Sequence, residues 1–533
     1  MEGCDSDIRY EGESISWSSC GEIDNRPLEC STIYVPMDHF ADEADQDLST
    51  KNFSIPLIRL RGRNATQNLL LNPGGPGGSG VEFMFRKGEH LSTIVGDGFH
   101  LLSFDPRGIN GSQPSGRCYA DGASRRKLSP RRPAMWDIVN DSPAAFAWSE
   151  NFGLACADVM GEHGKYLNTP QTAADMNNIL DALGQEDMVY WGFSYGTLLG
   201  QTYATMFPER SARVIIDGVA NQWDWYENLL DSEAFTDSEN VLDGFFSECI
   251  KAGEKCALSS LAETKEELWD VLFGFSDELR QQPLNVYVNS TTYGLFSHAN
   301  LWQDGLFNIL YKSEKWGEVA ETLTKLFRGN ATDAFLAWAW DTRDEDNSSF
   351  EAGRFIQTND GLAGPKYWPQ EREVMVDIIL PFFNSSMFSV ILYDDLFSKL
   401  HWKIPRVHNY VPKKDVQTKH PLLILSTTYD PICPLVSARG ASDAFVGSQI
   451  VEVEGYGHCS ISVPSMCIAR HVRSFLYEGK LPDSYTKCEV DGDYFNTPED
   501  GKLKAKMHFE DPEEREIHLA QVKLAWDMDW PIW

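Results

Sequence analysis

The sequence predicts an α/β protein with a mostly parallel central sheet and a large, mainly helical insertion. Short apolar runs alternate with helical stretches over the first 220 residues, and this alternation returns after residue 412. Between these two parts the apolar residues follow a helical spacing and tryptophans are dense. The third observation is a G-x-S-x-G motif at residues 192–196, set between an apolar run and a helical stretch.

The composition supports a folded chain with a substantial core. Of its 533 residues, 42% are hydrophobic and 12% are aromatic, which excludes a disordered chain. The formal net charge of -33 disfavours binding to nucleic acid or to an anionic membrane surface. No apolar run is long enough to span a bilayer. We therefore expect neither nucleic acid nor a membrane as a partner, and the oligomeric state stays open.

The predicted strands are short continuous apolar runs, which is typical of parallel strands that are buried on both faces. These runs lie at residues 69–71, 101–104, 188–193, 214–216, 421–425 and 449–453. The clearest helix between them is 172–183, which opens with Thr172-Ala173-Ala174-Asp175, similar to a capping box, and ends before Gly184. Parallel strands joined by such helices place helices on both faces of one sheet.

The patterns divide the chain into four segments. Residues 1–221 form the first part of the α/β core, and residues 413–490 form its second part. Residues 222–412 form a helical cap, or lid, inserted between the two parts. Residues 491–533 form a charged tail, and its tryptophans predict that it docks on the core; they are Trp526, Trp530 and Trp533.

Ser194 is the predicted nucleophile. In Gly192-Phe193-Ser194-Tyr195-Gly196, a sharp turn between strand and helix holds the serine in a strained conformation and lifts its hydroxyl above the sheet edge. The two glycines flank it because a Cβ at either position would collide with the adjoining strand or helix. The pentapeptide alone is a weak signal, and its flanks make it specific.

A serine hydroxyl needs an adjacent base, usually histidine, and an acid that orients the base. Asp430 follows the strand at 421–425 and a short turn, and Pro431 interrupts regular structure after it. His458 follows the strand at 449–453 within a glycine loop. Taken singly, each fits a surface aspartate or an ordinary loop histidine. In the order serine, aspartate, histidine, each after its own strand, they predict a catalytic triad of Ser194, Asp430 and His458.

A loop with five glycines at residues 72–80 follows the apolar run at 69–71. Such a loop leaves backbone N–H groups uncovered, as the stabilisation of a tetrahedral oxyanion requires. We expect Gly75 to supply one N–H group, with Gly74 as the alternative, and Tyr195 to supply the other. Prolines in the loop disfavour a flexible linker, and the lack of G-K-[ST] disfavours a phosphate loop. No histidine and cysteine cluster has metal-ligand spacing, so we expect no metal and no cofactor.

Cysteines and sequons predict a secreted glycoprotein. Several of the eleven cysteines lie at short spacings, such as Cys20 with Cys30, without a paired C-x-x-C motif, which is typical of disulfides in an oxidising compartment. Chance alone would produce several N-x-S/T sequons, and eight are present, at Asn52, Asn64, Asn110, Asn140, Asn289, Asn330, Asn347 and Asn384. The start, residues 1–5, is not a signal peptide, so we expect that a leader has been removed. The odd cysteine count leaves at least one free thiol, and Cys4 is the first choice.

Further motifs join the serine turn and the glycine loop in a specific combination. Near the triad they are Phe104-Asp105-Pro106-Arg107-Gly108, Asp430-Pro431, Gly457-His458 and Asp217-Gly218-Val219. Toward the two ends of the chain they are Trp17 followed by Cys20, Cys30 followed by residues 35–38, and the segment from Cys467 to Cys488. Together they resemble the secreted tripeptidyl aminopeptidases, a branch of the prolyl-iminopeptidase-like α/β-hydrolases with a characteristic C-terminal region. The resemblance spans residues 15–488 or nearly so, and it is weakest in the cap.

The resemblance implies the α/β-hydrolase fold and the triad named above. It also implies four disulfides, Cys20–Cys30, Cys118–Cys156, Cys249–Cys256 and Cys467–Cys488. Two residues depart from the family pattern: Cys433 lies close after Asp430, and Cys459 follows His458, where relatives usually carry a hydroxyl residue. These two cysteines either bridge neighbouring loops or stay free beside the site. The tail after Cys488 has no counterpart that we know in the family.

We expect a secreted serine aminopeptidase that releases short N-terminal peptides or residues through an acyl-enzyme. The alternative is an esterase or lactonase that uses the same triad on a small metabolite, because one fold and one triad serve many acyl substrates. A catalytically silent binding protein is a third hypothesis, which the intact triad disfavours. An exopeptidase also binds the α-ammonium group of its substrate. An acidic segment offers carboxylates for this, although a solvated face explains any single one; they are Asp224, Glu227, Asp231 and Glu233.

Overall fold

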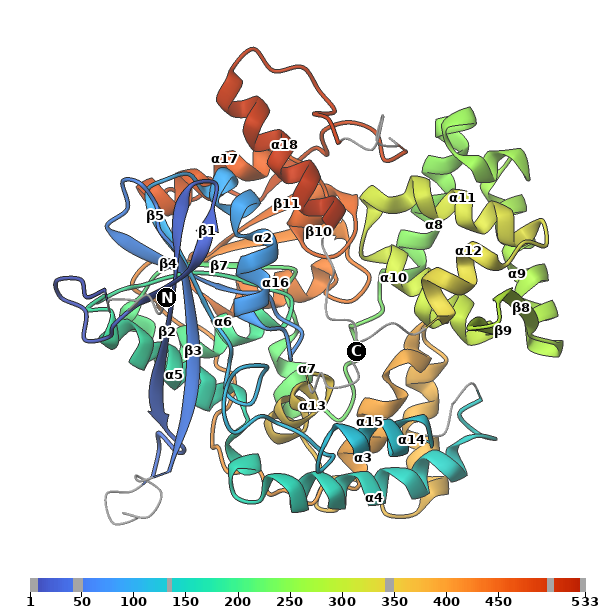
Figure 1. Cartoon of the computed structure of the whole chain (residues 1–533), viewed down its shortest axis with the longest axis horizontal. Coiled ribbons are helices and arrows are strands. Elements are labelled where there is room, and N and C mark those ends of the chain that lie inside the picture. Colours follow the sequence, from blue (N-terminus) through green and yellow to red (C-terminus); the bar gives the residue numbers. More distant parts are fainter. Residues whose placement is uncertain (1–7, 42–50, 132–136, 341–348, 496–502, 528–533) are drawn as a thin grey trace.

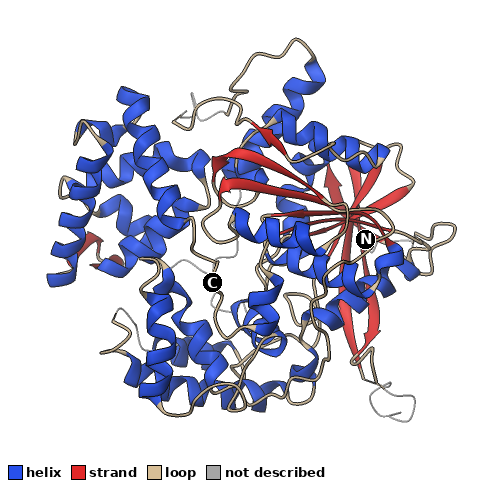
Figure 2. Cartoon of the chain, turned by 180° about the vertical axis from the view of Figure 1, so that it is seen from behind, coloured by secondary structure: helices blue, strands red, loops and turns tan. Residues whose placement is uncertain are grey.

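The fold is described from a computed structural model, which covers residues 8–41, 51–131, 137–340, 349–495 and 503–527. Its centre is a ten-stranded sheet with helices on both faces (Figures 1 and 2). In chain order the strands are β1 Ser18–Ile23, β2 Arg26–Pro36, β3 Asn52–Leu60, β4 Gln67–Asn72, β5 Phe99–Phe104, β6 Met188–Phe193, β7 Ser211–Asp217, β10 Leu423–Tyr429, β11 Gln449–Tyr456 and β12 Thr486–Cys488.

The strands lie in the order β1-β2-β3-β5-β4-β6-β7-β10-β11-β12. From β5 to β12 every neighbouring pair is parallel, and β1, β2 and β3 form an antiparallel edge. The predicted α/β fold with a mostly parallel sheet is therefore confirmed. Because β6, β7, β10 and β11 are adjacent and parallel, the loops that follow them meet at one edge of the sheet.

Successive side chains of one strand enter two different apolar clusters, which is why the parallel strands are apolar throughout. Leu69 and Leu71 pack on one face with Phe83, whereas Leu70 packs on the other face with Ile179. The first face is covered by α2 Gly80–Val95 and α17 Met466–Glu478, and the second by α5 Thr169–Ala182, α6 Tyr195–Met206 and α16 Leu435–Ala444.

The helix predicted at 172–183 begins earlier than expected. α5 starts at Thr169, and the side chain of Asn168 caps it by accepting the N–H group of Gln171 at 3.0 Å. Pro170 fits the first turn because its missing N–H group is not needed there. An asparagine cap followed by proline therefore overrides the capping-box pattern at Thr172.

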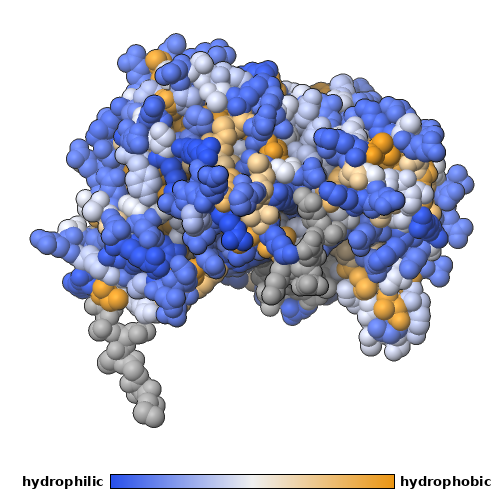
Figure 3. All heavy atoms as spheres, turned by 90° about the horizontal axis from the view of Figure 1, so that it is seen from above, coloured by the Kyte–Doolittle hydropathy of each residue, from blue (hydrophilic) through white to orange (hydrophobic). Residues whose placement is uncertain are grey.

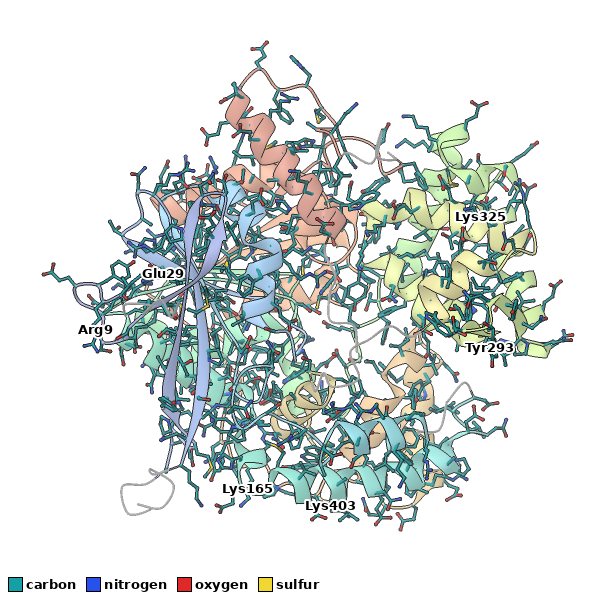
Figure 4. All side chains as sticks on the ribbon, viewed as in Figure 1. Arg9, Glu29, Lys165, Tyr293, Lys325 and Lys403 are labelled. Carbon is teal, nitrogen blue, oxygen red and sulfur yellow. A yellow bond between two sulfur atoms is a disulfide. The ribbon has the colours of Figure 1, made fainter. Side chains whose placement is uncertain are left out.

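Most helices between β7 and β10 form two lobes beside the sheet (Figure 1). The first lobe contains α8 Ser238–Ala252, α9 Lys265–Gln281, the hairpin β8 Leu284–Asn289 with β9 Thr292–Phe296, α10 Phe307–Leu310, α11 Trp316–Phe327 and α12 Thr332–Ala334. Tyr293 and Lys325, labelled in Figure 4, lie in it, far from Glu29 on β2. The second lobe contains α13 Ser349–Asp360, α14 Arg372–Phe383 and α15 Tyr393–Leu400. Two earlier helices, α3 Gly122–Leu128 and α4 Ser142–Met160, lie with it, and α4 contacts both α14 and α15.

The tail carries a last helix, α18 Pro512–Asp527, which packs on α2 and α17. The tail also contacts the first lobe, because the ammonium group of Lys506 lies 2.6 Å from the carboxylate of Glu314 and both are buried. Trp526 lies beneath the ammonium group of Lys315, at 5.4 Å. Trp530 and Trp533 lie outside the described residues.

The described residues contain four disulfides, and they are the four that the resemblance implies, Cys20–Cys30, Cys118–Cys156, Cys249–Cys256 and Cys467–Cys488. Cys433 and Cys459 are free and buried, and Cys4 lies outside the described residues. Across the described part of the chain, no helix combines the length and the apolar character needed to cross a membrane. The face seen in Figure 3 is mostly hydrophilic with scattered small apolar spots, in keeping with the net charge of -33.

Candidate active site

Ser194 lies at the sharp turn between β6 and α6. Its backbone angles are φ 57° and ψ -126°, a region that costs a non-glycine residue about 1–3 kcal/mol. Its N–H group donates to the carbonyl oxygen of Asp217 at 3.0 Å, and its own carbonyl accepts the N–H group of Thr197 at 2.8 Å. These bonds hold the strained turn in place, as in a nucleophile elbow.

The glycines around Ser194 allow three segments to approach closely. A Cβ at Gly192 would lie 2.4 Å from the carbonyl oxygen of Gly196, and a Cβ at Gly196 would lie 2.7 Å from that of Asn72. A Cβ at Gly74 would lie 2.3 Å from the carbonyl oxygen of Phe193. The glycine loop after β4 therefore rests directly against the serine turn.

Asp430 and His458 form a buried pair at the ends of β10 and β11. The Nδ1 atom of His458 lies 2.9 Å from each carboxylate oxygen of Asp430. Both side chains are fully buried, whereas Ser194 is 9% exposed. A carboxylate on Nδ1 orients the ring so that Nε2 is the atom left for proton transfer.

Backbone N–H groups fix the carboxylate of Asp430. One oxygen accepts the N–H groups of Ile432 at 3.0 Å and Cys433 at 2.8 Å, and the other accepts that of Cys459 at 2.9 Å. Such bonds stabilise the charged form of a buried carboxylate. The rotation of this side chain is therefore set by both loops of the pair.

Tyr311, which directly follows α10 of the first lobe, also contacts His458. Its carbonyl accepts the backbone N–H group of His458 at 3.3 Å. The two rings lie edge to face with centroids 4.8 Å apart. No sequence pattern pointed to Tyr311, because its contact with His458 depends on how the lobe folds against the sheet.

Ser194, His458, Gly75 and Tyr195 all line one cavity of about 590 Å³. The rest of its lining comes from the loop after β7, from Tyr311 and from the segment after Asp430: Ala220, Asn221, Trp225, Asp231, Ala234, Ile432, Cys433 and Ser437. The structure thus brings the predicted serine, histidine and two backbone donors to one cavity, with Asp430 behind the histidine.

The two glycines considered for the oxyanion differ in what their N–H groups do. The N–H group of Gly74 donates to the side-chain oxygen of Asn72 at 3.0 Å. Gly75, at φ 104°, lies on the cavity wall instead. Tyr195 is the first residue of α6, and the N–H groups of a first helical turn have no acceptor within the helix.

Of the four acidic residues considered for an α-ammonium group, all in the described part of the chain, Asp231 lines the cavity. The carboxylates of Asp224 and Glu233 accept bonds from neighbouring side chains, Asn228 at 2.6 Å and Asn221 at 2.8 Å respectively. Burial and the nearby Asp224 raise the pKa of Asp231 above its usual range, and Lys399 opposes this.

The two free thiols lie on either side of Asp430. Cys433 lines the cavity, and burial and Asp430 raise its pKa well above the ordinary value. The thiol of Cys459 donates to the carbonyl oxygen of Asp217 at 3.2 Å, and burial likewise raises its pKa. Both are therefore neutral thiols rather than nucleophiles.

Comparison with known proteins agrees with this architecture. The alpha/beta hydrolase fold family matches residues 67–463. The serine protease Hip1 of Mycobacterium tuberculosis is 27% identical over 508 residues, which cover 90% of this chain and 91% of that protein. The tripeptidyl aminopeptidase of Streptomyces lividans is 25% identical over 490 residues, which cover 89% of this chain and 86% of that protein. Carboxylesterase B of Mycobacterium tuberculosis is 27% identical over 495 residues, with 89% of each covered.

The resemblance to tripeptidyl aminopeptidases is thus confirmed over almost the whole chain. The family match spans more than half of the sequence and includes the serine turn and the aspartate and histidine loops. The chain therefore belongs to the α/β-hydrolase fold family and is a serine hydrolase of that family.

Proposed function

We propose that this serine hydrolase is an aminopeptidase that releases short peptides or single residues from the free N-terminus of a peptide. The observation that carries the proposal is that Asp231 and Ser194 line the same cavity. A carboxylate there offers a charge-assisted bond to the α-ammonium group while a carbonyl of the peptide meets the serine. Relatives named serine protease and tripeptidyl aminopeptidase support a peptide substrate.

In the proposed mechanism, Nε2 of His458 takes the proton of the Ser194 hydroxyl as its oxygen attacks the carbonyl carbon. Asp430, bonded to Nδ1 at 2.9 Å, keeps the ring oriented and stabilises the imidazolium. His458 then protonates the leaving amine, and an acyl-enzyme remains on Ser194. Water repeats the sequence and releases the N-terminal fragment as an acid.

The proposed oxyanion donors are the N–H groups of Gly75 and Tyr195. Gly75 is favoured over Gly74, because Gly74 already donates to Asn72. Tyr195 follows the nucleophile directly and opens α6, so its N–H group is available at the helix N-terminus. The mechanism needs no metal and no cofactor.

Asp231 is the proposed partner of the α-ammonium group. The charges that act on it are those of Asp224, Glu233 and Lys399, and Arg354 in turn acts on Lys399. Such a cluster would attract a further cation, and the N-terminal ammonium group of a peptide would supply it. Its net negative charge also raises the local concentration of cationic substrates.

Replacing Asp231 by asparagine is expected to lower kcat/KM for tripeptidyl amides with a free amino group by about 10- to 100-fold, since a charge-assisted bond in a partly buried site is lost. The same peptides with an acetylated amino group should be affected less than threefold. Steady-state kinetics on the two substrate sets measure the difference. Glu227→Gln, which removes an exposed carboxylate of the same segment, is the matched control and should change neither set.

The pH dependence follows from the raised pKa of Asp231. As pH falls through that pKa the carboxylate becomes neutral and loses the ammonium group, so KM for free peptides should rise on the acid side. It should rise again above about pH 8, where a peptide amino group loses its own proton. An acetylated substrate whose KM follows the same curve would contradict this role of Asp231.

An esterase acting on a small metabolite is the second candidate function, and the carboxylesterase relative favours it. The same triad would serve, because an ester needs only the nucleophile and the oxyanion donors. Parallel assays of simple esters and free tripeptidyl amides distinguish the two. Efficient ester turnover with no amide turnover, unchanged by Asp231→Asn, would replace the aminopeptidase proposal.

We also propose that residues 222–412 act as a cap over the serine. Trp225, Asp231, Ala234 and Tyr311 of this segment face Ser194 across the cavity, which supports that role. Residues 1–221 and 413–490 would then be the two parts of the core, with 491–533 as the docked tail. Cap residues would mainly determine the length of substrate that fits, since they form much of the cavity wall.

We propose further that the protein is a secreted glycoprotein. Its four disulfides support an oxidising compartment. Seven of the eight sequon asparagines are exposed, as glycosylation requires, and Asn347 lies outside the described residues; the seven are Asn52, Asn64, Asn110, Asn140, Asn289, Asn330 and Asn384.

Alkylation before reduction tests the cysteine assignment. In the denatured, unreduced protein iodoacetamide should label Cys433 and Cys459, together with the predicted free thiol of Cys4, and leave the paired cysteines unlabelled until a reductant is added. Peptide mass mapping identifies the labelled positions. Labelling of Cys118 or Cys156 before reduction would argue for a reducing compartment instead.

A further inference from the structure

Asp217 is a buried carboxylate that the mechanism above does not use. It is the last residue of β7 and lies between Phe193 of β6 and Leu425 of β10. It is fully buried. Its neighbours along the sheet edge are therefore the turn that carries Ser194 and the loops that carry Asp430 and His458.

Asp217 connects the serine turn to the histidine loop. Its backbone carbonyl accepts the N–H group of Ser194 at 3.0 Å and the thiol of Cys459 at 3.2 Å. Its carboxylate accepts both donors of Ser460, the N–H group at 2.6 Å and the hydroxyl at 2.7 Å. One residue thus holds the backbone on both sides of the proposed proton transfer.

The charge of Asp217 acts on His458 as well as on its own hydrogen-bond donors. Burial raises the pKa of Asp217 to about 6, against the opposing effects of hydrogen bonds from Ser460 and Trp191 and of the charge of His458. An asparagine amide has a single oxygen, so it would accept one donor of Ser460 and turn its NH₂ group toward the other. A negative charge near His458 has a use that an amide lacks, because it stabilises the imidazolium formed in each half of the reaction.

We propose that Asp217 is a positioning residue: it ties the Ser194 turn to the loop of His458, and its charge supports the imidazolium alongside Asp430. The proposal rests on the proposed roles of Ser194 and His458. Asp217 is not a catalytic residue in the strict sense, since its contacts are with the backbone of Ser194 and with Cys459 and Ser460.

The other titratable groups around His458 do not supply this charge. Tyr311, Cys433 and Cys459 all have pKa values raised well above their ordinary ranges, so they stay neutral at working pH. Asp237 acts on Asp430 from the start of α8. Asp430 bonds the imidazole directly, and Asp217 is a second carboxylate whose charge interacts with it.

The test is Asp217→Asn, studied in the full chain with a tripeptidyl amide. We expect kcat to fall about 10-fold with KM unchanged within twofold, because the imidazolium is formed only during the reaction. We also expect the acid limb of kcat/KM to move to lower pH by about 0.5 unit, because the variant lacks an anion that favours the charged imidazole. In the Asp430→Asn background the second substitution should lower kcat by about a further 10-fold.

Ser460→Ala is the companion variant. It removes the hydroxyl that binds Asp217 and leaves the charge, so kcat should fall about threefold while the acid limb does not move to lower pH. If Asp217→Asn does not fold, judged by its thermal unfolding, this variant still decides whether the tie matters. Wild-type kinetics for Ser460→Ala would overturn the positioning role.

Two outcomes for Asp217→Asn overturn the proposal, either unchanged kinetics or a fall in kcat without a shift of the acid limb. Failure of the proposed function itself gives a different signature. Wild-type protein that takes no fluorophosphonate label on Ser194 defeats the underlying mechanism. If the wild-type protein is labelled and active and Asp217→Asn has unchanged kinetics, only the inference about Asp217 fails.

Discussion

Replacement of Ser194 by alanine is expected to lower kcat by about 10⁵- to 10⁶-fold, the largest effect of any single substitution in this chain. In the proposed mechanism the hydroxyl oxygen of Ser194 forms the acyl-enzyme, and no other group takes its place. Cys433 lies in the same cavity, but burial raises the pKa of its thiol, so it offers no thiolate. Turnover of a free tripeptidyl amide and labelling by a fluorophosphonate should be lost together.

The fold should survive this change. Alanine at the same position bears the same φ of 57°, and Ser194 makes its structural bonds through backbone atoms. The melting temperature should therefore stay within about 2 °C, because a small change in a short polar side chain shifts stability by less than about 1 kcal/mol.

Ser437→Ala is the matched control for labelling, because it removes a second hydroxyl from the same cavity and should leave the label in place. A wild-type protein that resists the probe would revive the hypothesis of a binding protein on a hydrolase scaffold. A Ser194→Ala variant that still takes up the probe would move the nucleophile elsewhere.

The sequence predicted the parallel part of the sheet because its strands are buried on both faces. Each predicted apolar run overlaps a strand of the structure, for instance 188–193 with β6 and 214–216 with β7. The antiparallel strands β1, β2 and β3 and the short parallel strand β12 were not predicted: β1 has no buried residue, and β2 mixes exposed with buried residues. The start of α5 was predicted three residues late, since Asn168 and Pro170 form a stronger start signal than the capping box at Thr172.

Ser194, Asp430 and His458 could be identified because each follows its own strand, and neighbouring parallel strands end at one sheet edge. The sequence favoured Gly75 over Gly74 without a structural reason, and the hydrogen bond from Gly74 to Asn72 now supplies one. The sequence could not distinguish Asp231 from three neighbouring acidic residues, because its position at the cavity depends on the path of the segment after β7. Tyr311 and Asp217 act through contacts between segments far apart in the chain, and local patterns carry no such information.

Replacement of Asp430 by asparagine is expected to lower kcat by about 10³- to 10⁴-fold at neutral pH. Each oxygen of the carboxylate is an acceptor, since one takes the N–H groups of Ile432 and Cys433 and the other takes that of Cys459. An amide has only one oxygen. Whichever way it turns, its NH₂ group meets a backbone N–H group, and a buried donor is left without an acceptor at a cost of about 1–3 kcal/mol.

The same conflict reaches the histidine. Nδ1 of His458 donates its proton to Asp430 at 2.9 Å. If the amide NH₂ group faces Nδ1, the ring must carry its proton on Nε2, and the atom that should accept the serine proton is then blocked. If the amide oxygen faces Nδ1, the tautomer is right but the charge that supports the imidazolium is gone.

Steady-state kinetics and thermal unfolding of Asp430→Asn separate these effects, and Asp237→Asn is the matched control. Asp237 is a second carboxylate near Asp430, and its carboxylate bonds Asn240 at 3.0 Å, so its loss should change kcat less than threefold. An Asp430→Asn variant that kept wild-type kcat would mean that the imidazole draws its orientation from elsewhere, from Tyr311 on one side and the Asp217–Ser460 contact on the other. Asp430, at the end of β10, would then be a structural residue of its loop. The carboxylate of Asp217, at the end of β7, would be the charge that supports the reaction.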